Sequence, residues 1–516
     1  MRVAFVDPTN YVTNYGLRVL AAHVAQNGHE VVMVFLPPGV IDAAYDYPES
    51  VYADLDGILQ RMDIVGLSFV SNYYPQACAI TQHIKRTRRV PVVWGGIHAT
   101  AKPQESLEYA DMVCVGEGED ALLELLGKME EGKDVSKTPN FWFRRNGRIV
   151  RNDVRPLDSD IDRLPFPLYD VEREYFREGD RVARSSVEAL KGRLRLTPES
   201  MRYFGLEGNE GFSYLTLSSR GCPHSCTYCC NNLYLDLYRG KGRMVRRRSV
   251  GNLVAELECA IRAYPFLSFV SIFDDDFLAV NTTYIRDFAE QYRQRIGLPF
   301  KCNCSPPSVS VEKLELLVCA GLVSVEMGLQ TASPRVNMEV YGRRMDNAVF
   351  MAAARVLNGH RQLRVYYDVI MDNPFESAGD VVATARFLAE LPRPYALSTF
   401  SLTFFPGTEL WRRAQARGLV RDEAAQVYGK RNNAWYWEVN PYLKMLVRMA
   451  ASPFISAGTF RGWVFDRVLC SRLFVFFFDR RFILVGVNRI VRPVGRLLLS
   501  LSQGKRGPGP SGATRG

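Results

Sequence analysis

The chain has 516 residues, too many for one hydrophobic core, and its length predicts two or three domains of about 100–200 residues each. Its composition, 47% hydrophobic and 23% charged, is that of a globular protein. The net charge of +10 lies in the C-terminal region, where 13 Lys or Arg stand against two Asp from Lys444 onward. The body of the chain is therefore close to neutral, which makes nucleic acid an unlikely partner.

The 11 cysteines are odd in number and scattered along the chain, which argues against a framework of disulfides. A strand is predicted directly after Met1, with no signal peptide ahead of it. We therefore expect a cytoplasmic protein in a reducing compartment.

Residues 1–135 alternate short apolar runs with amphipathic ones. This alternation predicts a parallel, doubly wound sheet of the flavodoxin or Rossmann kind. The predicted strands are Arg2–Asp7, Glu30–Phe35, Ile64–Phe69, Val90–Trp94 and Met112–Val115. Ligands of such sheets bind at the carboxyl ends of the strands. The candidate binding residues there are Asn14, Gly16, Ser68, Gly95, Gly96, His98, Glu117 and Gly118.

Residues 136–212 are predicted to be a linker between domains. Within it, Asn146-Gly147 separates two short apolar runs and predicts a two-residue β-hairpin turn. The proline-containing stretch Leu157–Tyr169 is predicted to be extended, and Arg181–Phe212 has no assignment.

Three cysteines, Cys222, Cys226 and Cys229, follow the next predicted strand at C-x3-C-x2-C spacing. Three thiolates on one loop can bind a four-iron, four-sulfur cluster and leave the fourth iron open. A zinc site completed by Cys230 is the alternative, because structural zinc takes four ligands. The motif resembles the signature of the radical S-adenosylmethionine (SAM) superfamily, in which the open iron binds SAM. The resemblance implies that these cysteines are the catalytic cluster ligands and that Cys230 is a bystander or a supporting thiol.

Residues 213–412 carry six predicted strands alternating with helices, which is short of the eight of a closed barrel. They predict an open (β/α)6 partial barrel, as the radical SAM resemblance also implies. The predicted strands are Tyr214–Ser218, Leu267–Phe273, Phe300–Cys304, Val323–Leu329, Arg364–Met371 and Leu397–Phe404. By the same resemblance, the residues expected to bind SAM are Tyr228, Asp274, Asp275, Glu326 and Gln330. The segment 371–376 lacks the glycines that the family often has there.

The order of the two predicted domains, with Gly95-Gly96-Ile97-His98 and Val115-Gly116-Glu117-Gly118 in the first, resembles the B12-dependent class of radical SAM proteins. That resemblance implies that the first domain binds cobalamin through the residues at its strand ends. The D-x-H-x-x-G motif is absent, so we do not expect a histidine of that kind to bind cobalt. A flavodoxin-like domain without cobalt is the alternative.

Residues 413–503 are predicted to be helical and amphipathic, and the Gly/Pro-rich residues 504–516 to be disordered. No apolar run reaches the roughly 20 residues of a membrane span. Arginines beside apolar residues fit either basic helices on the inner face of a membrane or a helical cap on the barrel.

The resemblance implies an enzyme that cleaves SAM at a [4Fe–4S] cluster and, with cobalamin, methylates an unactivated carbon of a small or lipid-like molecule. Cobalamin-dependent cyclisation or rearrangement, and modification of tRNA without cobalamin, are the alternatives. An electron donor such as a flavodoxin or ferredoxin is the expected protein partner.

Overall fold

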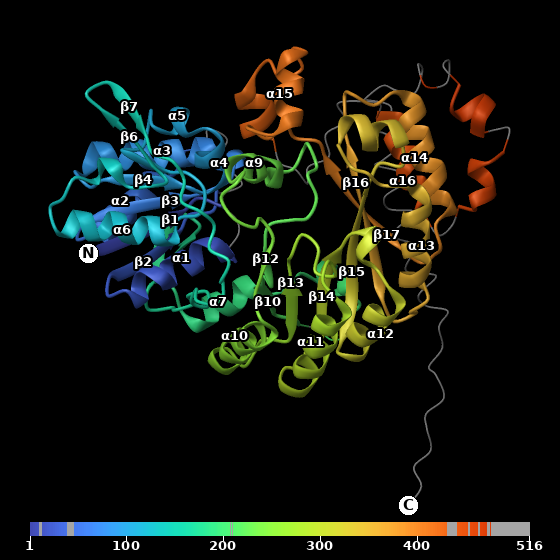
Figure 1. The fold of residues 1–516 in the computed structure, drawn as a ribbon, viewed down its shortest axis with the longest axis horizontal. Coiled ribbons are helices and arrows are strands. Elements are labelled where there is room, and N and C mark those ends of the chain that lie inside the picture. Colours follow the sequence, from blue (N-terminus) through green and yellow to red (C-terminus); the bar gives the residue numbers. More distant parts are fainter. Residues whose placement is uncertain are drawn as a thin grey trace, which may run out of the picture.

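The computed structural model describes residues 1–9, 13–38, 46–206, 208, 210–430, 441–452, 455–462, 465–471 and 475. Two α/β units lie next to each other, the first coloured blue to cyan and the second green to orange (Figure 1). Each is built on its own sheet, one of nine strands and one of six.

The first unit contains the predicted doubly wound sheet. Its central strands are parallel and lie in the order β5-β4-β3-β1-β2. Alternate side chains of β1 pack into separate cores on the two faces, Ala4 and Val6 in one and Val3 and Phe5 in the other. The elements are β1 Arg2–Asp7, α1 Tyr15–Gln26, β2 Glu30–Phe35, α2 Glu49–Leu59, β3 Ile64–Ser68, α3 Tyr74–Thr87, β4 Val92–Gly95, α4 Gly96–Ala101, α5 Pro103–Ser106, β5 Met112–Cys114 and α6 Glu119–Glu130.

Residues 136–212 do more than connect the two units, because four strands in this segment extend the first sheet at both edges. The hairpin at Asn146-Gly147 is confirmed, with φ of 50° and 72°, and it pairs antiparallel with β5. At the other edge β8 pairs parallel with β2, and the buried ion pair between Arg18 and Glu174, 2.6 Å apart, fixes it there. The elements are β6 Phe141–Arg145, β7 Arg148–Arg151, β8 Glu174–Glu178, β9 Arg181–Arg184, α7 Val187–Leu194 and α8 Pro198–Phe204.

The second unit is the predicted open barrel. Its six strands are parallel and follow one another in chain order, as expected for a partial (β/α) barrel. The strands are β10 Ser213–Thr216, β13 Phe269–Ile272, β14 Phe300–Cys304, β15 Leu322–Gln330, β16 Arg364–Met371 and β17 Ala396–Ser401. The helices are α9 Cys230–Leu237, α10 Val250–Ala263, α11 Thr282–Arg295, α12 Val311–Cys319, α13 Asn347–Asn358, α14 Ala378–Glu390 and α15 Glu409–Ala416.

Helix α8 closes the amino-terminal end of this barrel. Tyr203 stacks on Tyr366 and Phe204 stacks on Phe269, two residues near the beginnings of their strands. The carboxyl ends of the strands remain the open end, which is where parallel barrels carry their active sites.

The described part of the C-terminal region includes helix α16, Pro441–Ala450. It packs against α14 and the last strand, where Arg448 donates a hydrogen bond to the Thr399 hydroxyl at 2.7 Å. This helix therefore covers an edge of the barrel. The predicted basic segment beyond residue 475 and the tail 504–516 lie outside the described residues. Within the described part of the chain, no helix combines the length and apolar character needed to cross a membrane.

Candidate active site

The cysteine loop lies between β11, Ser219–Arg220, and helix α9. β11 pairs antiparallel with β12, Arg246–Arg247, and Gly221 then turns the chain with φ of 83°. A Cβ on Gly221 would lie 2.2 Å from the Met244 carbonyl oxygen, so no larger residue fits this turn. Cys222, Cys226 and Cys229 are all half-buried on the loop.

Thr227 anchors the middle of the loop to the barrel. Its N–H donates to the Tyr341 carbonyl at 3.0 Å and its hydroxyl to the Val340 carbonyl at 2.6 Å. The Leu410 N–H donates in turn to the Thr227 carbonyl at 2.9 Å. These three hydrogen bonds of Thr227 therefore hold the stretch between Cys226 and Cys229 against the barrel.

The environments of the three thiols differ. Burial raises the pKa of Cys222 to about 12 and also raises that of Cys226. A hydrogen bond from the Cys230 thiol lowers the pKa of Cys229, and Asn231 Nδ2 lies 3.6 Å from the same sulfur. Cys230 therefore lies beside Cys229, the position that a supporting thiol would take. Among the described residues, no three His, Cys, Asp or Glu side chains converge closely enough to bind one metal ion.

The acidic residues after β13 separate into different environments. Asp274 is buried and accepts hydrogen bonds from the Ser218 N–H at 2.6 Å and the Ser219 hydroxyl at 2.9 Å. Asp274 therefore fixes the start of the cysteine loop. The same two donors occupy the carboxylate that was expected to contact the ammonium group of SAM. Asp275 accepts from Asn231 Nδ2 at 3.0 Å, and its charge raises the pKa of Cys222. Asp275 is therefore the predicted acid that lies nearest to the cysteines.

Polar side chains line the inner wall of the barrel. Glu326 on β15 accepts from Lys301 Nζ at 2.8 Å and from the Tyr203 hydroxyl at 2.9 Å. Gln330 ends the same strand with φ of 65°, and its amide lies against Gly328, where a Cβ would be 2.6 Å from Nε2. Both predicted residues thus belong to β15, but Glu326 is already paired.

Two charged residues of this wall were not predicted. Arg343 donates to the carbonyls of Gly328 and Leu329, each at 2.9 Å. Its positive charge opposes the effect of burial on the pKa of Cys226. Burial raises the pKa of Asp368 to about 7, and its Oδ1 is buried without a hydrogen-bond partner among the described residues. Asp368 lies inside β16 and Arg343 in the loop after residue 340, and neither belongs to the motifs that carry the family resemblance.

Three of the residues expected to bind cobalamin meet at the carboxyl ends of β3 and β4. Ser68 pairs with Gly95, and a Cβ on Gly96 would lie 2.8 Å from the Ser68 hydroxyl. Val70, just beyond β3, is an apolar side chain that is 37% exposed. An edge with two glycines and an exposed apolar side chain fits a large, flat and partly apolar ligand such as a corrin.

Other predicted residues have protein partners of their own. Asn14 caps α1 by accepting from the Leu17 N–H at 3.3 Å and donates to Asp7 at 2.9 Å. Gly16 lies in the first turn of α1 with open space around its Cα. His98 is fully buried, contacts Tyr74 and Tyr428 ring to ring, and burial lowers its pKa to about 3. A buried, neutral histidine among aromatic rings is typical of a packed core.

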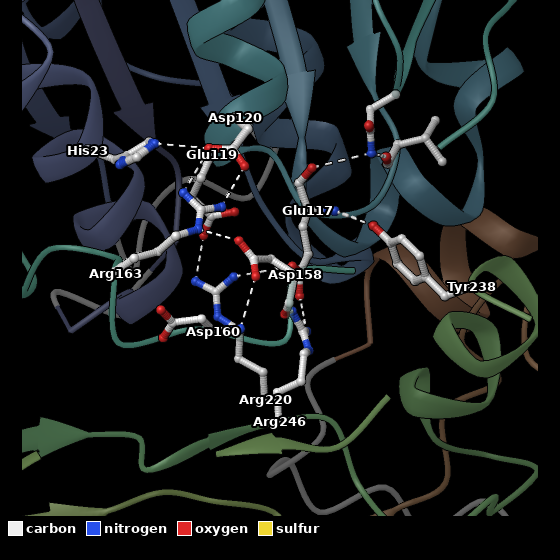
Figure 2. Close-up of polar contacts among 12 residues, drawn as sticks. His23, Glu117, Glu119, Asp120, Asp158, Asp160, Arg163, Arg220, Tyr238 and Arg246 are labelled. Carbon is white, nitrogen blue, oxygen red and sulfur yellow. Dashed lines mark hydrogen bonds and ion pairs between the residues drawn. The ribbon is translucent and has the colours of Figure 1, made fainter. Parts of the chain in front are cut away.

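Glu117 and Gly118 follow β5 and lie at the boundary between the two units. Glu117 forms an ion pair with Arg246, with one N–O distance of 3.0 Å, and its N–H donates to the Tyr238 hydroxyl at 2.7 Å (Figure 2). The first sheet thus presents its carboxyl edge to the segment that carries the cysteines. The site combines a three-thiol loop, a polar barrel interior and a glycine-lined sheet edge.

Comparison with known proteins agrees with this arrangement. Residues 1–126 match the B12 binding domain family and residues 216–388 match the radical SAM superfamily. The chain is 24% identical over 381 residues to an uncharacterized methyltransferase of Pyrococcus horikoshii, PH0819, covering 72% of this chain and 73% of that protein. It is also 30% identical over 200 residues to the cobalamin-dependent radical SAM methyltransferase TokK of Streptomyces tokunonensis, covering 37% of this chain and 26% of TokK.

The fold is shared with the radical SAM methyltransferase TsrM from Kitasatospora setae. The TsrM structure with cobalamin and a [4Fe–4S] cluster bound has a TM-score of 0.60 and 19% identity, and the match covers 81% of this chain and 75% of that one. The cofactors that belong to the two matched domains are cobalamin, a [4Fe–4S] cluster and SAM. This chain is a member of the cobalamin-dependent radical SAM enzymes, with an N-terminal B12 binding domain followed by a radical SAM domain.

Proposed function

We propose that the chain transfers a methyl group from SAM to an unactivated carbon of a small molecule. The observation that carries this proposal is the contact between the sheet edge at Glu117 and the segment that holds the cysteines, through Arg246 and Arg220. When bound, the cofactors supply single-electron cleavage of SAM and carriage of a methyl group. The protein has to hold both near one substrate carbon and exclude water from it.

Each candidate residue then has a separate task. Cys222, Cys226 and Cys229 hold the cluster, with the Cys230 thiol and Asn231 supporting the third sulfur. Their thiols must lose protons to bind iron, so the hydrogen bond that lowers the pKa of Cys229 assists loading. The residues proposed to contact SAM are Tyr228, Asp275, Glu326 and Gln330, with Asp274 bracing the loop.

The sheet edge is the proposed site of cobalamin, and the barrel interior is the proposed site of the substrate. Ser68, Gly95, Gly96 and Gly118 form the face offered to cobalamin, beside the exposed Val70. The polar side chains of Lys301, Glu326 and Asp368 on the inner wall support a polar substrate over a lipid-like one. A small electron-transfer protein such as a flavodoxin or ferredoxin is the proposed reductant.

The test is anaerobic reconstitution of the purified chain with iron, sulfide and hydroxocobalamin. We expect about four irons per chain, a cobalamin absorption band and formation of 5′-deoxyadenosine from SAM under reducing conditions. Cys226→Ala should lose the cluster and abolish 5′-deoxyadenosine formation.

Cys319→Ala is the matched control, because Cys319 is exposed at the end of α12, away from the cysteine loop, and its variant should retain both properties. SAM cleavage that persists in the Cys226→Ala variant contradicts the cluster assignment. A chain that never retains a corrinoid contradicts the cobalamin assignment. Untargeted comparison of metabolites with and without the active enzyme then tests methyl transfer, since a gain of one methylene differs in mass from cyclisation.

A further inference from the structure

Two carboxylates after β5 meet two arginines of the cysteine-bearing segment. Glu119 lies 2.5 Å from Arg220 Nη2, and Glu117 lies 3.6 Å from Arg220 Nη1. Glu117 also pairs with both terminal nitrogens of Arg246. Figure 2 shows the side chains of Arg220 and Arg246 pointing from the second unit toward the acids of the first.

One partner of each of the two shorter pairs is buried, whereas the other partners, Arg220 and Glu117, are 21% and 29% exposed. The side chains of Arg246 and Glu119 are 3% and 10% exposed. Burial opposes the charge of Glu119, but the neighbouring Arg220 outweighs it and the pKa of Glu119 is lowered. Short ion pairs in such surroundings fix geometry more firmly than solvated surface pairs, which contribute little.

The same turn of the first unit contacts the residues just before the cysteine loop and the end of the helix that follows it. Arg220 lies two residues before Cys222 and is paired with Arg246 in the β11–β12 ladder. Tyr238, just after α9, accepts the Glu117 N–H at 2.7 Å. The approach is close, since a Cβ on Gly116 would lie 2.1 Å from the Tyr238 hydroxyl.

We propose that Glu117 and Glu119 are positioning residues that clamp the cysteine loop to the carboxyl end of β5. The clamp sets the distance and orientation between the iron–sulfur cluster and cobalamin. This inference depends on the proposed function for its two cofactors, whereas the clamp itself is a property of the protein chain. Alignment matters because small displacements of reacting groups lower rates by large factors.

The matched variants are Glu119→Gln and Asp120→Asn. Glu119→Gln removes the charge that faces Arg220 and keeps the shape of the side chain. Asp120→Asn removes a partly exposed ion pair of the next residue, between Asp120 and Arg163 at 2.5 Å. Asp120 makes no direct ion pair with Arg220 or Arg246 among the described residues, and Arg163 connects to Arg246 only through Asp158. Both variants lie at the start of α6, so they share any local effect on that helix.

The first measurement is hydrogen–deuterium exchange of the full chain, as purified and after reconstitution. We expect Glu119→Gln to raise the exchange rate of amides 219–230 at least threefold, with Asp120→Asn close to the wild type. Since this measurement needs no cofactor, it tests the clamp even if the chain binds no cobalamin. A chain that binds no cobalamin would count against the proposed function alone.

The second measurement is the electron paramagnetic resonance spectrum of the reconstituted, reduced protein. The magnetic interaction between the cobalt(II) centre and the reduced cluster reports their separation. We expect Glu119→Gln to change that interaction while iron and cobalamin contents per chain stay at the wild-type values.

Wild-type exchange and an unaltered spectrum in Glu119→Gln would overturn the proposal. Glu117→Gln is the second variant if Glu119→Gln does not fold, and the same criteria apply to it. Equal effects of Asp120→Asn and Glu119→Gln would also overturn it, because the effect would then belong to α6 and not to the clamp.

Discussion

At the scale of single residues, the barrel interior contains carboxylates whose surroundings differ. Glu326 has Lys301 at 2.8 Å, whereas one oxygen of Asp368 is buried without a partner among the described residues. Burial of the Asp368 carboxyl favours its neutral form and outweighs the opposing effects of the Lys301 charge and the Ser398 hydrogen bond. Asp368 is therefore the residue of this wall whose protonation should depend most on pH.

The pH dependence of stability follows from that shift. The folded-state pKa of Asp368, about 7, lies above the unfolded value of 3.8, so its contribution to stability is full below pH 4 and is lost as pH rises through 7. Asp368→Asn mimics the neutral form and should therefore raise the melting temperature at pH 8 more than at pH 5. Thermal unfolding followed by fluorescence measures the difference.

The exposed Asp287→Asn serves as the control and should have the same small effect at both pH values. A shift in melting temperature for Asp368→Asn that is equal at pH 5 and pH 8 would contradict the assignment.

At the scale of elements, the cysteine loop depends on one backbone conformation. Gly221 combines φ of 83° with a carbonyl oxygen 2.2 Å from where a Cβ would lie. Gly240 also has a positive φ, 74°, but open space around it. The two glycines therefore separate the cost of the backbone conformation from the cost of the clash.

We expect Gly240→Ala to cost about 1 kcal/mol, the usual penalty for the left-handed region, with the loop intact. Gly221→Ala must in addition displace Met244 and separate β11 from β12. Iron bound per chain after reconstitution should therefore fall severalfold in Gly221→Ala and stay normal in Gly240→Ala. Normal iron content in both variants would show that the loop adjusts without losing its site.

At the scale of the whole molecule, helix α16 connects the C-terminal region to the barrel by a buried ion pair. Lys444 contacts Asp372, which has φ of 59° just after β16, and Ser401 donates to the same carboxylate at 2.6 Å. Leu443 and Val447 of α16 are 1% exposed in the barrel core. The pair therefore lies where α16 joins the barrel.

Removal of one partner should destabilise more than removal of both. Asp372→Asn removes the negative charge that faces the buried Lys444 ammonium and should cost up to about 3–5 kcal/mol, whereas Asp372→Asn with Lys444→Met should recover most of that loss. Urea denaturation of the two single variants and the double variant measures the coupling. If the losses of unfolding free energy in the two single variants add up in the double variant, the coupling between Lys444 and Asp372 is contradicted.

Much of this protein follows from local sequence patterns. The alternation of apolar runs predicted the doubly wound sheet and all six barrel strands, because each strand buries its own side chains. The cysteine motif resembles the radical SAM signature, and the match of residues 216–388 to that superfamily confirms the resemblance. The Asn146-Gly147 turn was equally local.

The remaining features depend on contacts between distant residues, which only the tertiary structure decides. Residues 136–212 were predicted to be a linker, yet β8 pairs with β2 across more than a hundred residues, with a parallel partner that no local pattern specifies. Asn14, Asp274 and Glu117 are polar residues at strand ends or loops, as a ligand would require, but protein donors already contact them. The sequence by itself determined which chemistry the chain carries, since that chemistry resides in local motifs. The tertiary structure decided which polar groups remain for ligands, because hydrogen-bond partners become known only when distant segments meet.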